Sequence, residues 1–194
     1  MKKNVLIALI VFIGFVVVYL FMPRTVALPK LALVKDPHLP AITGETFTFS
    51  TEKPKLVAFF FTECPNVCPM TVIDLLKVQQ SLVDEGISEQ QYDVVFITLD
   101  PEVDTVEKIQ QYKEQFAITA ENWFFLRGTV EQTEKVAKQF NMYFTKGPDG
   151  TIVHSTTMYV VDRDNQIRAH HPMSTGAQSM NVEQLTENLK SLLQ

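Results

Sequence analysis

The hydrophobic positions divide the chain into an apolar start and a longer part in which strand and helix patterns alternate. Asn4 to Met22 carries no charged residue and is apolar on all sides, unlike the single stripe of a helix that packs on a core. A helix of this length just crosses a hydrocarbon core of about 30 Å. Lys2 and Lys3 precede the stretch and Arg24 follows it, so the positive-inside rule places the N-terminus in the cytoplasm. We predict a single transmembrane anchor over residues 1–24.

A cleaved signal peptide is the alternative interpretation of this start. Thr25-Val26-Ala27 offers a passable cleavage site, but the apolar stretch exceeds the roughly 7–15 residues of a usual signal-peptide core. We therefore favour an uncleaved anchor. Residues 25–40 contain three prolines and no periodicity, which predicts an extracytoplasmic tether that leads to a domain over 41–194. The short Met-Lys-Lys start favours a bacterial cell membrane over an imported mitochondrial protein.

The domain shows the alternation of an α/β fold. Leu56 to Phe61 and Asp93 to Leu99 are continuous apolar runs of strand length, typical of central strands that are covered on both faces. Further strands are predicted at 46–50, 122–126, 156–161 and 166–170, the last two as a hairpin. Helical patterns occupy 69–86, 104–116, 129–140 and 182–193. This order of elements indicates helices layered on a sheet.

Composition narrows the possible functions. The chain has 17 basic and 22 acidic residues and a net charge of −5, which argues against nucleic acid and anionic membrane surfaces as partners. It has two cysteines and therefore at most one internal disulfide. A domain of this size buries an adequate core without a covalent staple. We infer that the cysteines serve reactivity rather than folding.

The two cysteines stand together where a predicted buried strand ends, in Cys64-Pro65-Asn66-Val67-Cys68-Pro69. A helical turn would place their Cα atoms roughly 6 Å apart, within the range of about 4.4–6.8 Å that a disulfide tolerates. The same turn aims both sulfurs at one point, where a soft metal ion can bind. A helix N-terminus also stabilises a thiolate. We expect Cys64 to be the more exposed and more acidic thiol, with Cys68 as the resolving thiol or second ligand.

His154 is the best candidate for a third ligand. It lies between a predicted turn at 147–150 and the strand at 156–161, where a loop can reach across. Two sulfurs and an imidazole suit Cu(I), although zinc accepts the same ligands with water as the fourth. Disulfide exchange is less favoured, because three residues rather than two separate the cysteines. Val153 to Thr156 also lacks the proline that thioredoxin-like reductases place opposite their dithiol.

Three segments of the chain resemble the Sco/SenC family. They are Cys64 to Pro69 with the preceding Phe59 to Glu63, the run Thr98 to Thr105, and His154 to Tyr159. The resemblance extends from about Pro40 to the C-terminus. It implies a thioredoxin-like fold, a membrane anchor, and copper bound by both cysteines and the histidine. It also implies a role in building the binuclear copper centre of cytochrome c oxidase.

The resemblance assigns copper to three side chains, namely Cys64, Cys68 and His154. It makes the copper-bearing subunit II of a terminal oxidase the expected partner. Asp100 matches the acidic residue of the family's Asp-Pro segment, and we expect it to orient a ligand or contact the partner. Val106 stands where the family often has proline, and Asp162-Arg163-Asp164-Asn165 replaces its common Asp-Pro-x-Gly turn. Both departures fall at positions that we take to be structural.

Other potential ligands have ordinary structural explanations. His170 and His171 are adjacent, and adjacent side chains on a strand point to opposite faces, so we predict a solvated strand end. Met158 follows His154 on a predicted strand and is expected to be a core methionine.

Two enzyme classes remain as alternatives to a copper chaperone without enzymatic activity. One is a thiol-disulfide oxidoreductase that keeps the cysteines of the oxidase subunit reduced, with His154 tuning a thiol. The other is a peroxidase that resembles the peroxiredoxins. That class normally has threonine three residues before its reactive cysteine, and Phe61 stands there relative to Cys64.

Overall fold

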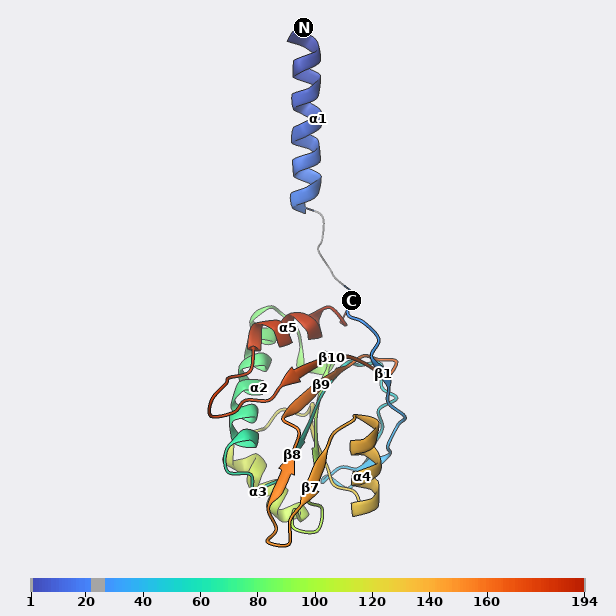
Figure 1. Ribbon diagram of the computed structural model, residues 1–194, viewed down its shortest axis with the longest axis vertical. Coiled ribbons are helices and arrows are strands. Elements are labelled where there is room, and N and C mark those ends of the chain that lie inside the picture. The colour runs from blue at the N-terminus through green and yellow to red at the C-terminus, as the bar shows by residue number, and fades with distance from the viewer. Residues whose placement is uncertain (1, 22–26, 194) are drawn as a thin grey trace.

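The computed structural model describes residues 2–21 and 27–193, as one N-terminal helix and a domain built on a mixed sheet (Figure 1). The helices are α1 (Lys2–Phe21), α2 (Val67–Asp84), α3 (Val106–Gln115), α4 (Val130–Gln139), α5 (Val182–Lys190) and the 3-10 helix η1 (Glu89–Gln91). The strands of the main sheet are β1 (Ala32–Leu33), β4 (Lys55–Phe60), β5 (Asp93–Thr98), β6 (Trp123–Leu126), β9 (Thr157–Val161) and β10 (Gln166–Pro172). Two small sheets pair β2 (Leu39–Pro40) with β3 (Thr46–Phe47), and β7 (Phe144–Lys146) with β8 (Ile152–His154).

The main sheet has the strand order β1-β10-β9-β4-β5-β6. β4, β5 and β6 run parallel, and β9 and β10 add an antiparallel hairpin on the other side of β4. Parallel strands need a crossover between them, and α2 and α3 provide the crossovers from β4 to β5 and from β5 to β6. The α/β fold class predicted from the sequence is confirmed.

Both faces of the sheet are covered, as the continuous apolar runs predict. Leu56, Ala58 and Phe60 of β4 belong to one buried cluster, together with side chains of α2, α3 and α5. The alternate residues, Val57 and Phe59, belong to a second cluster with side chains of α4 and of the segment that precedes β4. The strand period of two explains this division, because successive side chains point to opposite faces.

Helix α1 occupies most of the stretch in which we predicted a membrane anchor. In the part of the chain that the structure describes, no helix is both long enough and apolar enough to cross a membrane. The anchor therefore stays a prediction. Its last predicted residues, 22–24, lie outside the described residues, as do Thr25 and Val26 of the alternative cleavage site.

The segment predicted to be a tether packs against the domain over much of its length. β1 pairs with β10, and Val34 and Leu39 are fully buried. Arg168 of β10 donates from Nε to the carbonyl oxygens of Leu28 and Pro29 at 3.1 and 3.0 Å. Such short pairings and single buried side chains leave no periodic signal, so the sequence pattern did not reveal them. The chain thus joins the domain at the end of the sheet where β10 begins.

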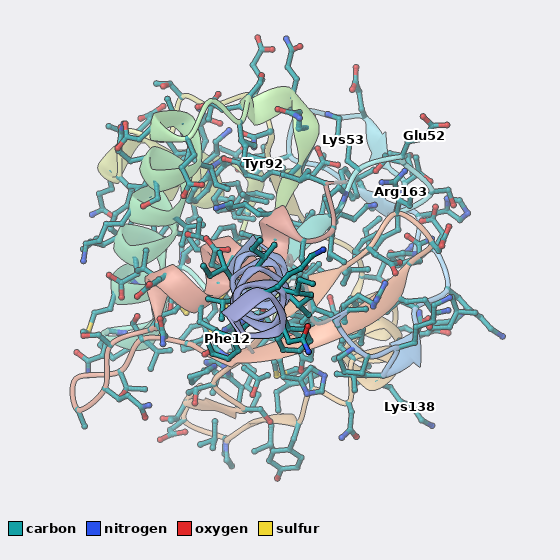
Figure 2. All side chains as sticks on the ribbon, turned by 90° about the horizontal axis from the view of Figure 1, so that it is seen from above. Phe12, Glu52, Lys53, Tyr92, Lys138 and Arg163 are labelled. Carbon is teal, nitrogen blue, oxygen red and sulfur yellow. The ribbon has the colours of Figure 1, made fainter. Side chains whose placement is uncertain are left out.

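A buried lysine lies at that same end of the sheet. Lys55, the first residue of β4, has no exposed surface, and its Nζ donates to the carbonyl oxygen of Lys53 at 2.7 Å. Figure 2 labels Lys53 in a view onto this end of the domain. Burial lowers the pKa of Lys55 from 10.5 to about 8, because the charged form loses its hydration.

This pKa predicts a pH dependence of stability. Between pH 8 and 10.5 the unfolded chain binds more protons at Lys55 than the folded chain, so the free energy of unfolding rises with pH in that window. We expect the wild type to gain up to ~3 kcal/mol relative to Lys55→Met across the window, as measured by urea unfolding at each pH. If the free energies of unfolding of the two proteins changed in parallel with pH, Lys55 would be charged in the folded state and the prediction would be wrong.

Candidate metal site

The cysteine pair lies where β4 ends and α2 begins. Cys64 donates its backbone N–H to the carbonyl of Phe61 at 3.2 Å, which closes a turn after the strand. α2 starts at Val67, and its N-cap residue Asn66 makes no side-chain cap bond. Instead, the backbone N–H of Cys68 donates to the Cys64 sulfur at 3.3 Å. The sulfur therefore takes the place of the oxygen acceptor that usually caps a helix.

The two thiols have opposite acidities. The thiol of Cys68 donates a hydrogen bond to the Cys64 sulfur. This bond is the main reason that the pKa of Cys64 is lowered to about 4. The same bond, together with burial, raises the pKa of Cys68. Cys64 is 7% exposed and Cys68 is fully buried, and no disulfide joins them in the structure. As predicted, Cys64 is the more exposed and more acidic thiol, and it is a thiolate at neutral pH.

His154 lies at the end of β8, in a hairpin that the sequence pattern did not predict. Its Nδ1 is 2.8 Å from the carbonyl oxygen of Ser155, and since a carbonyl only accepts, Nδ1 carries the proton. Nε2 is the ring nitrogen that remains to act as a ligand. The imidazole is close enough to Cys64 to lower the pKa of that thiol further, and its ring makes an edge contact with Phe61 at 5.9 Å between centroids.

These three side chains suit a soft metal ion, but they do not form a closed coordination site. Within residues 2–21 and 27–193, no group of three His, Cys, Asp or Glu side chains is placed to hold a metal ion. A thiolate, a thiol beside it and the His154 imidazole nevertheless gather at one edge of the sheet. Binding a metal through all three therefore requires the imidazole to move toward the sulfurs and Cys68 to lose its proton.

Asp100 lies near this edge but is bound to another partner. Its carboxylate accepts a hydrogen bond from Lys146 Nζ at 2.8 Å, and the residue is largely buried. Asp100 lines a surface cleft of about 420 Å³ that Phe61 and Pro65 of the cysteine loop also line. Its predicted role, to orient a ligand or contact a partner, stays a prediction.

Asp104 is a structural support of the site that the sequence did not reveal, because we took it only for a helix start. Its buried carboxylate accepts hydrogen bonds from the backbone N–H and hydroxyl of Thr62 and from the hydroxyl of Thr98. Burial raises the pKa of Asp104. These bonds join the loop before Cys64 to the end of β5. The only sequence signal was its place within the Asp-Pro segment.

The remaining candidates take structural positions. His170 is exposed and His171 is buried, which confirms that the two side chains point to opposite faces of β10. The prediction of a solvated strand end is wrong for His171, whose Nε2 is 3.0 Å from Nδ2 of Asn188 in α5. Helix α5 covers this face of β10 and removes His171 from solvent. Met158 is fully buried, which confirms a core methionine.

A dithiol at the carboxyl end of a parallel strand, leading into a helix, defines the thioredoxin-like class of proteins. Within that class, the family model described as SCO1/SenC matches residues 41–194. This chain therefore belongs to the SCO1/SenC family, which confirms the resemblance noted in its sequence.

Individual relatives agree with this assignment. The chain is 31% identical over 116 residues to the human mitochondrial protein SCO1 homolog, a match that covers 57% of this chain and 37% of the human protein. The copper-bound crystal structure of Arabidopsis thaliana ScoI has a TM-score of 0.68 and 26% identity, and the match covers 82% of this chain and 98% of that one. BsSco, described as a member of the Sco family of cytochrome c oxidase assembly proteins, has a TM-score of 0.71 at 21% identity, with 85% and 95% covered.

The hydrogen bond from Cys68 predicts that the Cys64 thiol is unusually acidic, which can be tested by titration. We expect ultraviolet thiolate absorbance of the reduced chain to report Cys64 titrating at about pH 4. Cys68→Ala removes the main donor and should shift this titration upward, whereas His154→Ala should shift it less. A Cys64 titration that is the same in the wild type and in Cys68→Ala would contradict the account.

Proposed function

We propose that this chain binds copper as cargo through Cys64, Cys68 and His154 and helps to build the binuclear copper centre of cytochrome c oxidase. The observation that carries the proposal is the meeting of one thiolate, one thiol and the His154 imidazole at a single sheet edge. Membership of the SCO1/SenC family and the copper-bound relative support copper over zinc. The expected partner is the copper-bearing subunit II of a terminal oxidase.

The acidities of the two cysteines describe how the ligand set would form. Cys64 is already ionised at neutral pH and can take copper without losing a proton. Cys68 holds its proton in the bond to Cys64, so its deprotonation accompanies metal binding. Nε2 of His154 then completes a soft set of three ligands, which suits Cu(I). Both cysteines must be reduced for this role.

Copper titration of the reduced full-length chain tests the proposal. We expect about one copper per chain in competition with a Cu(I) chelator, and a large loss of affinity in Cys64→Ser and in Cys68→Ser. His154→Ala should retain the sulfur ligands and bind copper roughly ten-fold or more weakly, as the loss of one of three ligands implies. Wild-type affinity in all three variants would exclude this site.

A thiol-disulfide oxidoreductase is the second candidate function. The pairing of an acidic thiolate at Cys64 with a protonated thiol at Cys68 is also the arrangement of an attacking and a resolving thiol. In that case His154 would tune Cys64 rather than bind metal. The His154→Ala variant separates the two functions, because unchanged copper affinity together with lost disulfide exchange would favour the oxidoreductase.

We further propose that residues 1–24 anchor the chain in the cell membrane, that residues 25–40 link the anchor to the domain, and that the domain lies outside the cytoplasm. Large apolar side chains of α1 are exposed, among them Val11, Phe12 and Phe15 at 66–70%. Figure 2 labels Phe12 on this helix. The chain joins the domain where β10 begins, at the opposite end of the sheet from Cys64. An anchored domain would therefore present its copper site away from the membrane.

The anchor is tested by membrane fractionation of bacterial cells that express the chain. We expect the full-length protein in the membrane fraction after high-salt washing, since salt releases proteins held only by charge. A chain that lacks residues 1–24, exported by an unrelated cleavable signal, should appear in the soluble fraction. Full release of the full-length chain by salt would argue against a spanning helix.

A further inference from the structure

The hairpin that carries His154 is separate from the main sheet. β7 and β8 pair with each other, from Phe144 with His154 to Lys146 with Ile152, and form their own two-stranded sheet. In Figure 1 the hairpin lies beyond the end at which β9 begins, and its strand β7 shares a surface cleft with α4. Strand pairing with the body of the domain therefore does not fix where His154 stands.

Packing holds the hairpin only partly, and surface clefts lie on two sides of it. One, of about 420 Å³, separates Thr151 and Ile152 from the cysteine loop. The other, of about 430 Å³, lies between β7 and the side chains of Val130 and Thr133 at the start of α4. Phe144 of β7 and Ile152 of β8 are only partly buried against the core, so the hairpin gains less from packing than the fully buried strands β4 and β5.

An ion pair crosses from the hairpin to the body of the domain between these clefts. Lys146 Nζ of β7 is 2.8 Å from Asp100 Oδ1, and Asp100 is nearly buried, with its side chain 9% exposed. Asp100 is itself fixed just after β5, since its N–H donates to the Thr98 hydroxyl at 2.9 Å and its carbonyl accepts from the Asp104 N–H at 2.8 Å. The lysine is thus tied to a rigid point at the sheet edge.

We propose that Lys146 is a positioning residue for the copper ligand His154. Its ion pair with Asp100 holds the β7–β8 hairpin so that the imidazole stands beside Cys64 and needs only a short movement to reach the sulfurs. Lys146 pairs with Ile152 in the hairpin, and Ile152 stands two residues before His154 on the same strand. The position of Lys146 therefore influences the position of His154 through the paired strands. The inference rests on the proposed copper site and gives Asp100 its role, which is to anchor the hairpin rather than to touch the metal.

A double-mutant cycle on Cu(I) affinity of the reduced full-length chain tests this inference. We expect Lys146→Gln to weaken Cu(I) binding roughly ten-fold. This is the lower end of the loss in metal affinity that follows removal of a residue supporting a ligand. Lys146→Arg keeps the ion pair and should restore the affinity. In the His154→Ala background, Lys146→Gln should have no further effect, because the ligand on which it acts is gone.

The matched control is Lys77→Gln. Lys77 pairs with Asp74 at 2.6 Å, and that carboxylate is also 9% exposed, but the pair lies on α2 away from the hairpin. The Lys77→Gln variant should therefore leave Cu(I) affinity unchanged. A copper-free readout is the nuclear Overhauser effect between the rings of Phe61 and His154, which Lys146→Gln should weaken.

Each other outcome is decisive. An equal loss of affinity from Lys146→Gln with and without His154 would mean that Lys146 acts through the fold or the cysteines, and the inference fails. Unchanged or increased affinity in Lys146→Gln, with weakened binding in His154→Ala, overturns the inference but leaves the proposed function intact. If the reduced wild type binds no copper, the proposed function fails and the inference fails with it.

Discussion

The site depends on the parallel pairing of two buried strands, β4 and β5. Their register places Phe60 opposite Thr98, so the loops that follow both strands emerge at the same edge of the sheet. Asp104 then joins the loops, because its buried carboxylate binds Thr62 on one side and Thr98 on the other. The turn before Cys64 and the first turn of α2 are thereby held in place. The acidity of Cys64 follows from this arrangement, which lets Cys68 donate both its backbone N–H and its thiol to one sulfur.

The site combines a rigid part with a loosely packed part. The cysteines lie in the buried cluster of α2 and β4, whereas His154 lies on a hairpin with surface clefts on both sides. Such a division suits the proposed binding of copper as cargo, because a ligand set that is not fully closed can release its metal. The ion pair between Lys146 and Asp100 provides an intermediate restraint, since a lysine that is 35% exposed is held less firmly than a buried group.

The sequence predicted the fold well where hydrophobic runs are long. Leu56 to Phe61 and Asp93 to Leu99 appear as β4 and β5, because a strand covered on both faces needs an unbroken apolar run. The sequence also predicted that Cys64 is the more acidic thiol, but from its place at a helix N-terminus, whereas the main cause in the structure is the hydrogen bond from the Cys68 side chain. β1, β7 and β8 were not predictable, because two- or three-residue strands are defined by long-range pairing rather than by a local pattern. For the same reason the partnership of Lys146 with Asp100, far apart in the chain, left no trace in the sequence.

The most direct test of the copper site is X-ray absorption spectroscopy of the reduced, Cu(I)-loaded chain. We predict two sulfur ligands and one nitrogen ligand in the wild type, and loss of the nitrogen contribution in His154→Ala. A spectrum with sulfur ligands alone in the wild type would contradict the role of His154. A spectrum without sulfur would contradict the site as a whole.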